Sequence, residues 1–104
     1  MSTPRITKQP DNVNVNLYKS ASFMCSAHGF GLLKILWKRI NYTLPATATI
    51  TEEKSLNELS STLKIFEAIG YYSGQYCCVA ENVAGNVTSC TAKLHVKQSK
   101  LESI

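Results

Sequence analysis

Apolar and polar residues alternate with a period of two along several short stretches of the chain. Residues 13–17 are apolar at every second position, which is the pattern of a strand with one buried face. The same pattern and strand-forming composition predict further strands over residues 21–25, 32–40, 47–51, 62–66, 75–80 and 87–96. No stretch of ten or more residues shows a helical period with caps. Short strands separated by turns predict an all-β sandwich or barrel.

Turn signals separate these strands. Residues 52–58 are polar and predict a turn, and Asn82-Val83-Ala84-Gly85 predicts a turn between the last two strands. The chain has 104 residues, which suits one domain. We expect this domain to span residues 4–97, with flexible ends at residues 1–3 and 98–104.

Composition narrows the class of protein. The chain is 44% hydrophobic and 17% charged, which is ordinary for a folded globular domain and unlike a disordered one. Its net charge of +4 is too small to indicate a nucleic-acid partner. No apolar run reaches the roughly 18 residues of a membrane span, so we expect no membrane segment in this chain. The polar N-terminus lacks the apolar region of a signal peptide, so a secreted parent would make this chain an excised piece.

The four cysteines are the main chemical feature. Cys25, Cys77, Cys78 and Cys90 allow three fully paired connectivities. The spacing of a zinc site is absent, because no Cys-x-x-Cys occurs and the two histidines, His28 and His95, are far apart in sequence. No nucleophile, base and orienting group stand at a readable spacing. We therefore expect no metal, no cofactor and no enzymatic activity.

The spacing of four residues carries a family resemblance. Trp37 follows Cys25 by 12 residues, Cys78 follows it by 53, and Gly74 and Tyr76 precede Cys78 by four and two. This spacing resembles the immunoglobulin superfamily, whose fold is a sandwich of two antiparallel sheets with Greek-key connections. The resemblance implies a Cys25–Cys78 disulfide between the sheets, Trp37 packed against it, and a Tyr76 hydroxyl bonded back to the chain. Pro10, the 82–85 turn and Leu94-x-Val96 resemble the I-set within that superfamily.

Two groups of I-set domains compete as the nearest resemblance. Gln75-Tyr76-Cys77-Cys78 with Ser89-Cys90 resembles receptor tyrosine kinase domains from muscle, which implies a second, surface disulfide between Cys77 and Cys90. The segment 90–96 instead resembles cytoplasmic muscle domains of the titin and telokin kind, in which the matching cysteine is a free core residue. Strand parity points Cys90 inward, but a bulge before Leu94 would turn it outward. One departure from the family is Tyr72, at a position where an aspartate usually forms an ion pair.

Candidate surface sites follow from strand parity and short motifs. Asn41-Tyr42-Thr43 and Asn86-Val87-Thr88 are N-glycosylation sequons at Asn41 and Asn86. The residues predicted to face outward from one sheet form a basic face with an apolar centre, at Lys34, Leu36, Lys38, Val79, Lys93, His95 and Lys97. Such a face suits an acidic protein or an acidic, sulfated glycan. The alternative is a solvated lysine-rich face that prevents edge pairing.

These features predict a non-enzymatic recognition or adhesion module. The first hypothesis is a domain from the extracellular part of a cell-surface receptor or adhesion molecule, with a homophilic or heterophilic protein partner. The alternative is a cytoplasmic, titin- or telokin-like structural domain of a muscle or cytoskeletal protein, with all cysteines reduced.

Overall fold

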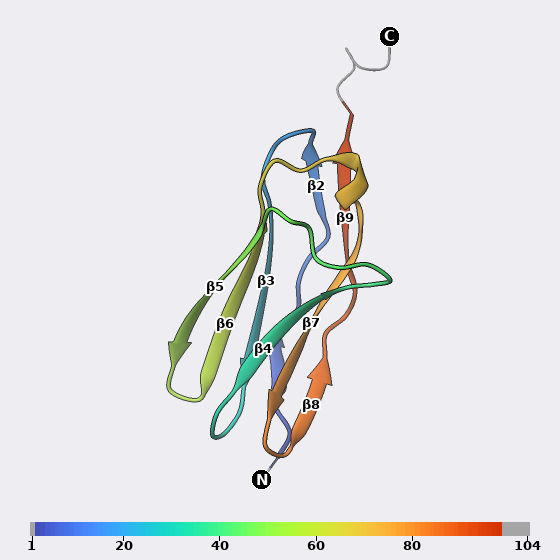
Figure 1. The fold of residues 1–104 in the computed structure, drawn as a ribbon. Coiled ribbons are helices and arrows are strands. Elements are labelled where there is room, and N and C mark those ends of the chain that lie inside the picture. The colour runs from blue at the N-terminus through green and yellow to red at the C-terminus, as the bar shows by residue number, and fades with distance from the viewer. Residues whose placement is uncertain (1, 99–104) are drawn as a thin grey trace.

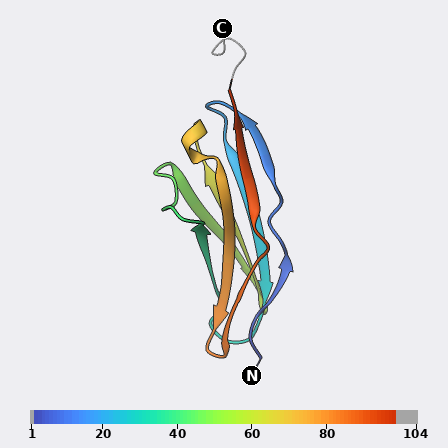
Figure 2. The ribbon, with the colours of Figure 1, turned by 90° about the vertical axis from the view of Figure 1, so that its right-hand side faces the viewer.

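A computed structural model describes residues 2–98 of the chain. Its elements follow one another as β1 (Arg5–Lys8), β2 (Val13–Asn16), β3 (Ala21–His28), β4 (Lys34–Arg39), β5 (Ala48–Ser55), β6 (Glu58–Ile65), the short 3₁₀ helix η1 (Gly70–Tyr72), β7 (Gly74–Asn82), β8 (Gly85–Thr88) and β9 (Ala92–Lys97). The strands form two layers that pack face to face in an elongated molecule (Figures 1 and 2). The predicted all-β sandwich is confirmed.

The two sheets have the strand orders β1-β3-β6-β5 and β2-β9-β7-β4, and β8 adds to the second sheet beside β7. One pair corrects the expectation of purely antiparallel sheets, because β2 and β9 run parallel. The chain begins in the first sheet, where β1 pairs with β3, and then crosses to the second sheet. Pro10 lies in the connection, and a proline lacks the backbone N–H that a continuous strand would need there.

The core lies between the sheets and is built from alternate residues of the strands. In β4 every second residue is buried, starting at Ile35, and in β9 the buried residues are Ala92, Leu94 and Val96. Strand β6 contributes Leu63, which no solvent reaches. This alternation is what the period-two pattern predicted for these segments.

The turn predicted over residues 52–58 is present but covers only two residues. Strand β5 continues to Ser55 and β6 begins at Glu58, so only Leu56 and Asn57 make the turn. Asn57 takes a left-handed conformation with φ of 61°, which asparagine tolerates well. The polar residues stay in a strand because β5 is a sheet edge whose side chains are almost all exposed. Exposed strand positions carry polar residues without cost, so polarity alone is a poor turn signal here.

The predicted strand over residues 87–96 is two strands, β8 and β9. Val79 on β7 pairs with Thr88, and Tyr76 on β7 pairs with Ala92. The three residues 89–91 therefore lie opposite only two residues of β7, at positions 77 and 78. This extra residue is a β-bulge, and it reverses which side chains face the core beyond it. Cys90 is therefore exposed although Leu94 is buried.

Two elements were not predicted, the short strand β1 and the helix η1. At the ends, the Ser2 carbonyl accepts a hydrogen bond of 3.1 Å from the Asn82 side chain. The expectation of flexible ends concerns mostly residues outside the described range of 2–98. Strand β1 begins at one end of the molecule and β9 finishes at the other (Figure 1).

Candidate functional site

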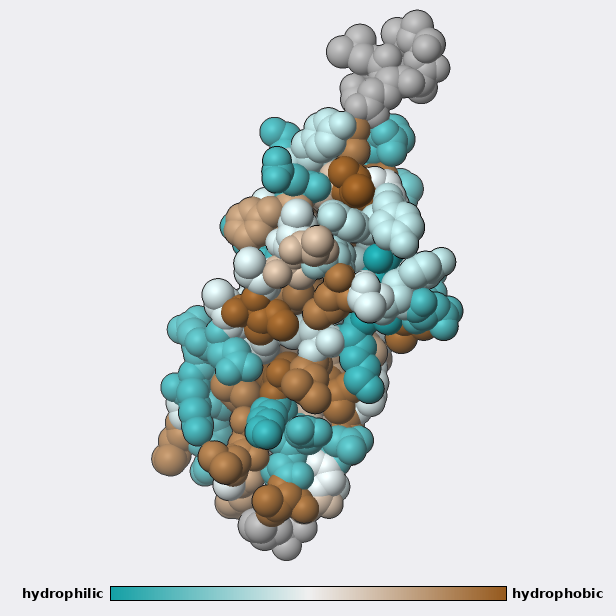
Figure 3. Space-filling model, in the orientation of Figure 1, coloured by the Kyte–Doolittle hydropathy of each residue, from teal (hydrophilic) through white to brown (hydrophobic). Residues whose placement is uncertain are grey.

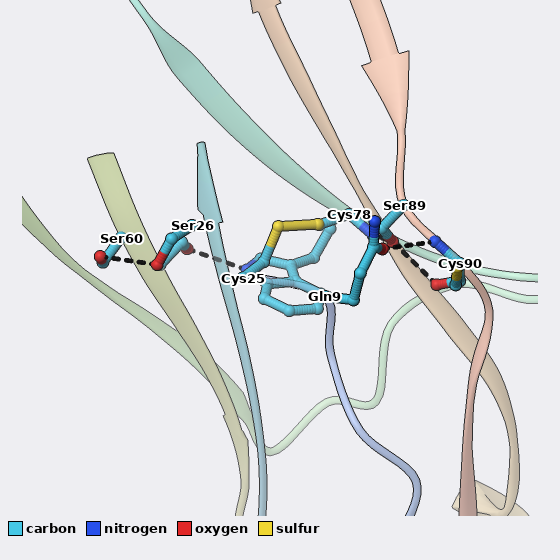
Figure 4. Close-up of a disulfide and its surroundings, with 9 residues drawn as sticks. Gln9, Cys25, Ser26, Ser60, Cys78, Ser89 and Cys90 are labelled. Atoms are coloured by element: carbon cyan, nitrogen blue, oxygen red, sulfur yellow. Dashed lines mark hydrogen bonds between the residues drawn. A yellow bond between two sulfur atoms is a disulfide. The ribbon is translucent and has the colours of Figure 1, made fainter. Parts of the chain in front are cut away.

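A disulfide between Cys25 on β3 and Cys78 on β7 ties the two sheets together (Figure 4). Their Cα atoms lie 6.6 Å apart, and both residues are fully buried. The bridge closes a loop of 53 residues. In the chain-entropy account, closing a loop of that length stabilises a folded domain by about 4 kcal/mol. The bridge implied by the family resemblance is present in the structure.

Trp37 lies in the same core cluster as the bridge, and the Tyr76 hydroxyl bonds back to the chain, as the resemblance implied. Trp37 pairs with Cys78 across β4 and β7 and belongs to the same core cluster as the disulfide. The Tyr76 hydroxyl donates a hydrogen bond of 2.7 Å to the Tyr72 carbonyl, four residues back along the chain. Its ring stacks on Phe23, with ring centres 5.3 Å apart. Burial raises the pKa of Tyr76 above its ordinary value.

Gly74 is the first residue of β7 and follows the short helix η1 by two residues. Its φ of 156° favours glycine, and a Cβ at this position would lie 3.5 Å from the Arg39 Nε. Such a distance is an ordinary van der Waals contact, so the backbone conformation and not the space beside Arg39 favours glycine at this position. These residues position the sheet, and none of them offers a surface to a partner.

Cys77 and Cys90 are unbridged in the structure, so the predicted second disulfide is not formed there. Cys77 is buried on β7 and Cys90 is exposed on the bulge. Extending the β7–β8 register of Val79↔Thr88 by two residues places Cys77 opposite Cys90. Two hydrogen bonds from side chains hold the bulge in place (Figure 4). Ser89 Oγ on the bulge accepts one from Cys78 N on β7, and Gln9 Oε1 accepts the other from Cys90 N on the bulge.

The outer surface of β4 presents three exposed side chains, Lys34, Leu36 and Lys38. Leu36 is 46% exposed and lies between the two lysines. Val79, predicted as the apolar centre of this surface, is only 7% exposed because it sits between Leu36 and Thr88 in the sheet. The prediction for Val79 is wrong in this respect, and Leu36 is the apolar residue that a partner could reach.

The three basic residues of β9 lie apart from the two lysines of β4. Lys93, His95 and Lys97 are exposed, but β9 pairs with β7 only over residues 92–94. Beyond that point β9 lies beside β2, so His95 pairs with Asn14 and Lys97 with Asn16. The predicted single basic face is therefore divided into a β4 part and a β9 part.

Two apolar residues that the sequence patterns did not single out extend the β4 part. Leu32 and Val83 are largely exposed, and they line a groove of about 220 Å³ together with Lys34, Glu81 and Asn82. Val83 is an apolar residue inside the predicted turn over residues 82–85, which is a signal that could have found it, whereas Leu32 was expected at the start of the 32–40 strand and lies before β4. We call Leu32, Lys34, Leu36, Lys38 and Val83 the Leu36 face.

The view in Figure 3 shows how hydrophobic surface is distributed over one side of the molecule. Brown surface gathers along the middle and toward the end where the N-terminus lies, with hydrophilic borders on both sides. The loop before β4 and the β7–β8 turn, which carry Leu32 and Val83, lie at that same end (Figure 1).

Both sequon asparagines are exposed. Asn41 lies just after β4 with φ of 67°, and Asn86 lies on β8 opposite Glu81. Within residues 2–98, no three His, Cys, Asp or Glu side chains gather closely enough to hold a metal ion. No helix in the described part of the chain has the length and apolar character of a membrane span.

Comparison with known proteins adds a family and a set of relatives. The sequence model described as "Immunoglobulin I-set domain" matches residues 4–96. The chain is 32% identical over 100 residues to human Roundabout homolog 1, and 35% identical over 85 residues to human Peroxidasin homolog. These alignments cover 94% and 81% of this chain, but only 6% of each relative.

Solved structures are similar over nearly the whole chain. The N-terminal Ig1-2 module of the Drosophila receptor protein tyrosine phosphatase DLAR superposes with a TM-score of 0.81 at 28% identity, covering 95% of this chain and 51% of that one. Titin domains z1z2 in complex with telethonin superpose with a TM-score of 0.79 at 26% identity, covering 94% and 49%. The chain thus spans a small part of its curated relatives, and its relatives and structural neighbours include both receptors and titin.

Proposed function

Because this chain belongs to the immunoglobulin I-set family, we propose that it is a non-enzymatic protein-recognition module from the extracellular part of a cell-surface receptor or adhesion protein. The observation that carries the proposal is the Leu36 face. A half-exposed leucine stands there between two lysines on the flat outer surface of a sheet. An apolar centre with a charged rim is the usual composition of a protein interface.

The chemistry of the Leu36 face indicates the partner. Burying Leu36 and the two apolar residues of the groove supplies the favourable free energy of association. Lys34 lies opposite Glu81 across β4 and β7, so its charge is offset in part. Lys38 favours a partner with an acidic residue beside an apolar contact and speeds the encounter at low salt. The partner is either another protein or a second copy of this chain.

Two features favour the extracellular setting. Structural disulfides persist in oxidising compartments and are rare in the cytosol, and Cys25–Cys78 is such a bridge. Both sequon asparagines are exposed and accessible to glycosylation. The similarity to a receptor, DLAR, also supports this setting, and the relatives include Roundabout homolog 1 and Hemicentin-1.

A binding experiment with matched variants tests the Leu36 face. The domain is first tested for self-association by sedimentation and then screened against a panel of purified receptor ectodomains. We expect Leu36→Glu to weaken the interaction found by at least about tenfold, the order of one hot-spot residue. Ile50→Glu is the matched control, because Ile50 is also 46% exposed but lies on β5 in the other sheet. A partner lost in Ile50→Glu and kept in Leu36→Glu would contradict the proposal.

A second candidate function is a cytoplasmic structural domain of the titin type. It is favoured by the titin neighbours, one of them solved in complex with telethonin, and by the free thiols of Cys77 and Cys90. Expression in mammalian secretory cells separates the two settings. The receptor proposal expects secretion of folded protein with a glycan on Asn41 or Asn86, shown by a mass shift that peptide N-glycosidase removes. Retention in the cell without any glycan would favour the titin-like alternative.

The acidic-glycan partner suggested by the basic residues has its own test. Lys93, His95 and Lys97 would bind a sulfated chain along β9. The expected result is retention on heparin beyond that of a globular protein of equal charge. Equal retention would leave only a protein partner in the proposal.

A further inference from the structure

Arg39 is a buried cation whose hydrogen bonds go to carbonyl groups. It points inward at the end of β4 and is only 7% exposed. Its Nη2 donates to the carbonyl oxygens of Tyr71 and Ser73, and its Nε has no hydrogen-bond partner among the described residues. Tyr72, four residues before Tyr76, supplies no carboxylate to this cation. Carbonyl dipoles neutralise a buried charge only in part, so an anion is favoured beside this guanidinium.

Tyrosine rings surround the guanidinium. Its carbon lies 4.7 Å from the centre of the Tyr42 ring, 5.4 Å from that of Tyr71 and 5.7 Å from that of Tyr76. Tyr76 is buried, whereas Tyr42 and Tyr71 are 60% and 69% exposed. The two exposed rings therefore cover Arg39 from the solvent side. Exposed side chains change rotamer within nanoseconds, so these rings can turn aside and admit a ligand.

A pocket of about 370 Å³ opens at this place, between the β4–β5 loop and η1. This volume lies in the range of roughly 300–1,000 Å³ that ligand pockets occupy. Arg39 is the one cationic side chain among its lining residues, and Leu44, Pro45 and Ile69 supply apolar wall. A single positive charge next to apolar and aromatic surface fits one negative charge next to an apolar group.

We propose that this pocket binds a carboxylate that stands beside an aromatic or apolar group, presented by an acidic peptide segment of a protein partner. The planar guanidinium matches a carboxylate in shape and in hydrogen-bonding pattern. The site is separate from the Leu36 face, since Arg39 points to the other side of β4 from Leu36. It lies near the end at which β9 finishes, because Ser73 Oγ, next to η1, accepts a hydrogen bond of 3.0 Å from Val96 N. The proposal therefore stands apart from the proposed function and is tested without it.

The test uses two small probes that differ in one charge. N-acetyl-L-phenylalanine carries a carboxylate, and N-acetyl-L-phenylalaninamide has the same ring with a neutral amide. Each is titrated into ¹⁵N-labelled domain and followed by NMR, including the Arg39 Nε–H signal. We expect saturable shifts in the β4–β5 loop and η1, with at least about tenfold tighter binding of the acid, the order of one charge-assisted hydrogen bond. Equal affinities, or no saturable shift with the acid, would overturn the proposal.

Variants locate the binding at Arg39. Arg39→Gln is expected to remove the preference for the acid, whereas Lys64→Gln, which loses the same charge from an exposed position on β6 outside both proposed sites, is expected to keep it. Because Arg39→Gln removes a buried side chain and could unfold the domain, Ala46→Glu is the second variant. Ala46 is exposed and lines the pocket, so a glutamate there repels the probe without disturbing the core. Ala46→Gln is its size-matched control and is expected to bind normally.

Sodium sulfate at matched ionic strength separates a carboxylate site from a general anion site. Because screening depends on ionic strength and is therefore the same as in the sodium chloride control, we expect sulfate to leave the acid's affinity unchanged within about a factor of two. Full competition by sulfate, or normal acid binding in Ala46→Glu, would overturn the assignment of a carboxylate to this pocket.

Discussion

The indole Nε1 of Trp37 donates a hydrogen bond of 2.9 Å to the hydroxyl oxygen of Ser61 across the sandwich. Trp37 lies on β4 in one sheet and Ser61 on β6 in the other, so this bond joins the sheets independently of the disulfide. Ser61 is fully buried, and a buried indole N–H needs an acceptor. Ser61 therefore supplies the acceptor that the buried indole N–H of Trp37 needs.

Replacing Ser61 by alanine is expected to destabilise the domain by about 1–3 kcal/mol, because the indole N–H stays buried and loses its acceptor. Urea unfolding followed by tryptophan fluorescence measures the loss. Ser22→Ala on the neighbouring strand β3 is the control, since Ser22 is exposed and its change should stay within about 0.5 kcal/mol. An equal effect of both substitutions would show that the Trp37–Ser61 bond adds nothing.

Tyr76 is expected to make stability depend on pH in the alkaline range. Burial raises its pKa in the folded protein, so the unfolded chain loses the phenolic proton first, near pH 10. Where the unfolded state binds fewer protons, stability falls as pH rises. Tyr76→Phe lacks this proton and also lacks the hydrogen bond to the Tyr72 carbonyl. Its free energy of unfolding should be about 1 kcal/mol lower near pH 7, with the deficit narrowing above about pH 10.

Urea unfolding of both proteins at several pH values measures this difference. The other tyrosines and lysines are common to the two proteins and cancel in the comparison. A deficit that stays constant or widens up to about pH 11 would contradict burial as the cause of the raised pKa of Tyr76.

The structure predicts a definite pattern of thiol labelling. Iodoacetamide should label native protein once, at the exposed Cys90, and label it a second time at Cys77 after unfolding without reductant. Cys25 and Cys78 should stay unlabelled until reductant is added, also after exposure to a glutathione buffer at cytosolic poise. Intact-mass measurement counts the labels, and Cys90→Ser should remove the first one.

No label on unfolded, unreduced protein would mean that Cys77 and Cys90 are bridged, as the receptor-like resemblance implied. The β7–β8 register would allow this outcome, because its extension by two residues beyond Val79↔Thr88 would place Cys77 opposite Cys90. Labelling of all four cysteines would instead favour the cytoplasmic alternative.

Gly85 is expected to tolerate a side chain poorly. Its φ of 148° is unfavourable for other residues, and a Cβ there would come within 2.8 Å of the Thr3 methyl carbon. Gly85→Ala should therefore destabilise the domain by about 1–3 kcal/mol in a thermal melt. Adding Thr3→Ala to Gly85→Ala should recover part of the loss, because it removes the close contact and leaves the backbone strain. If the double variant is no more stable than Gly85→Ala, the whole loss of stability comes from the backbone conformation at position 85.

The parts of the candidate site that the sequence predicted are those that depend on spacing. Cys25, Trp37, Tyr76 and Cys78 stand at intervals that place them together in any sandwich of this family, and the structure brings them together. The parts that it missed depend on neighbours in space. Val79 has an outward parity but lies between Leu36 and Thr88, which no pattern along β7 alone reveals.

The sequence by itself determined the all-β class and most strand positions, because period-two patterning is a local property of the chain. The pairing of Cys25 with Cys78 came from the resemblance to the immunoglobulin superfamily, and the structure contains that bridge. Tertiary structure decided the orientation of Cys90, the split of the basic residues between β4 and β9, and the surroundings of Arg39. Each of these depends on the register between strands distant in sequence. A shift of one residue in that register moves side chains to the opposite face.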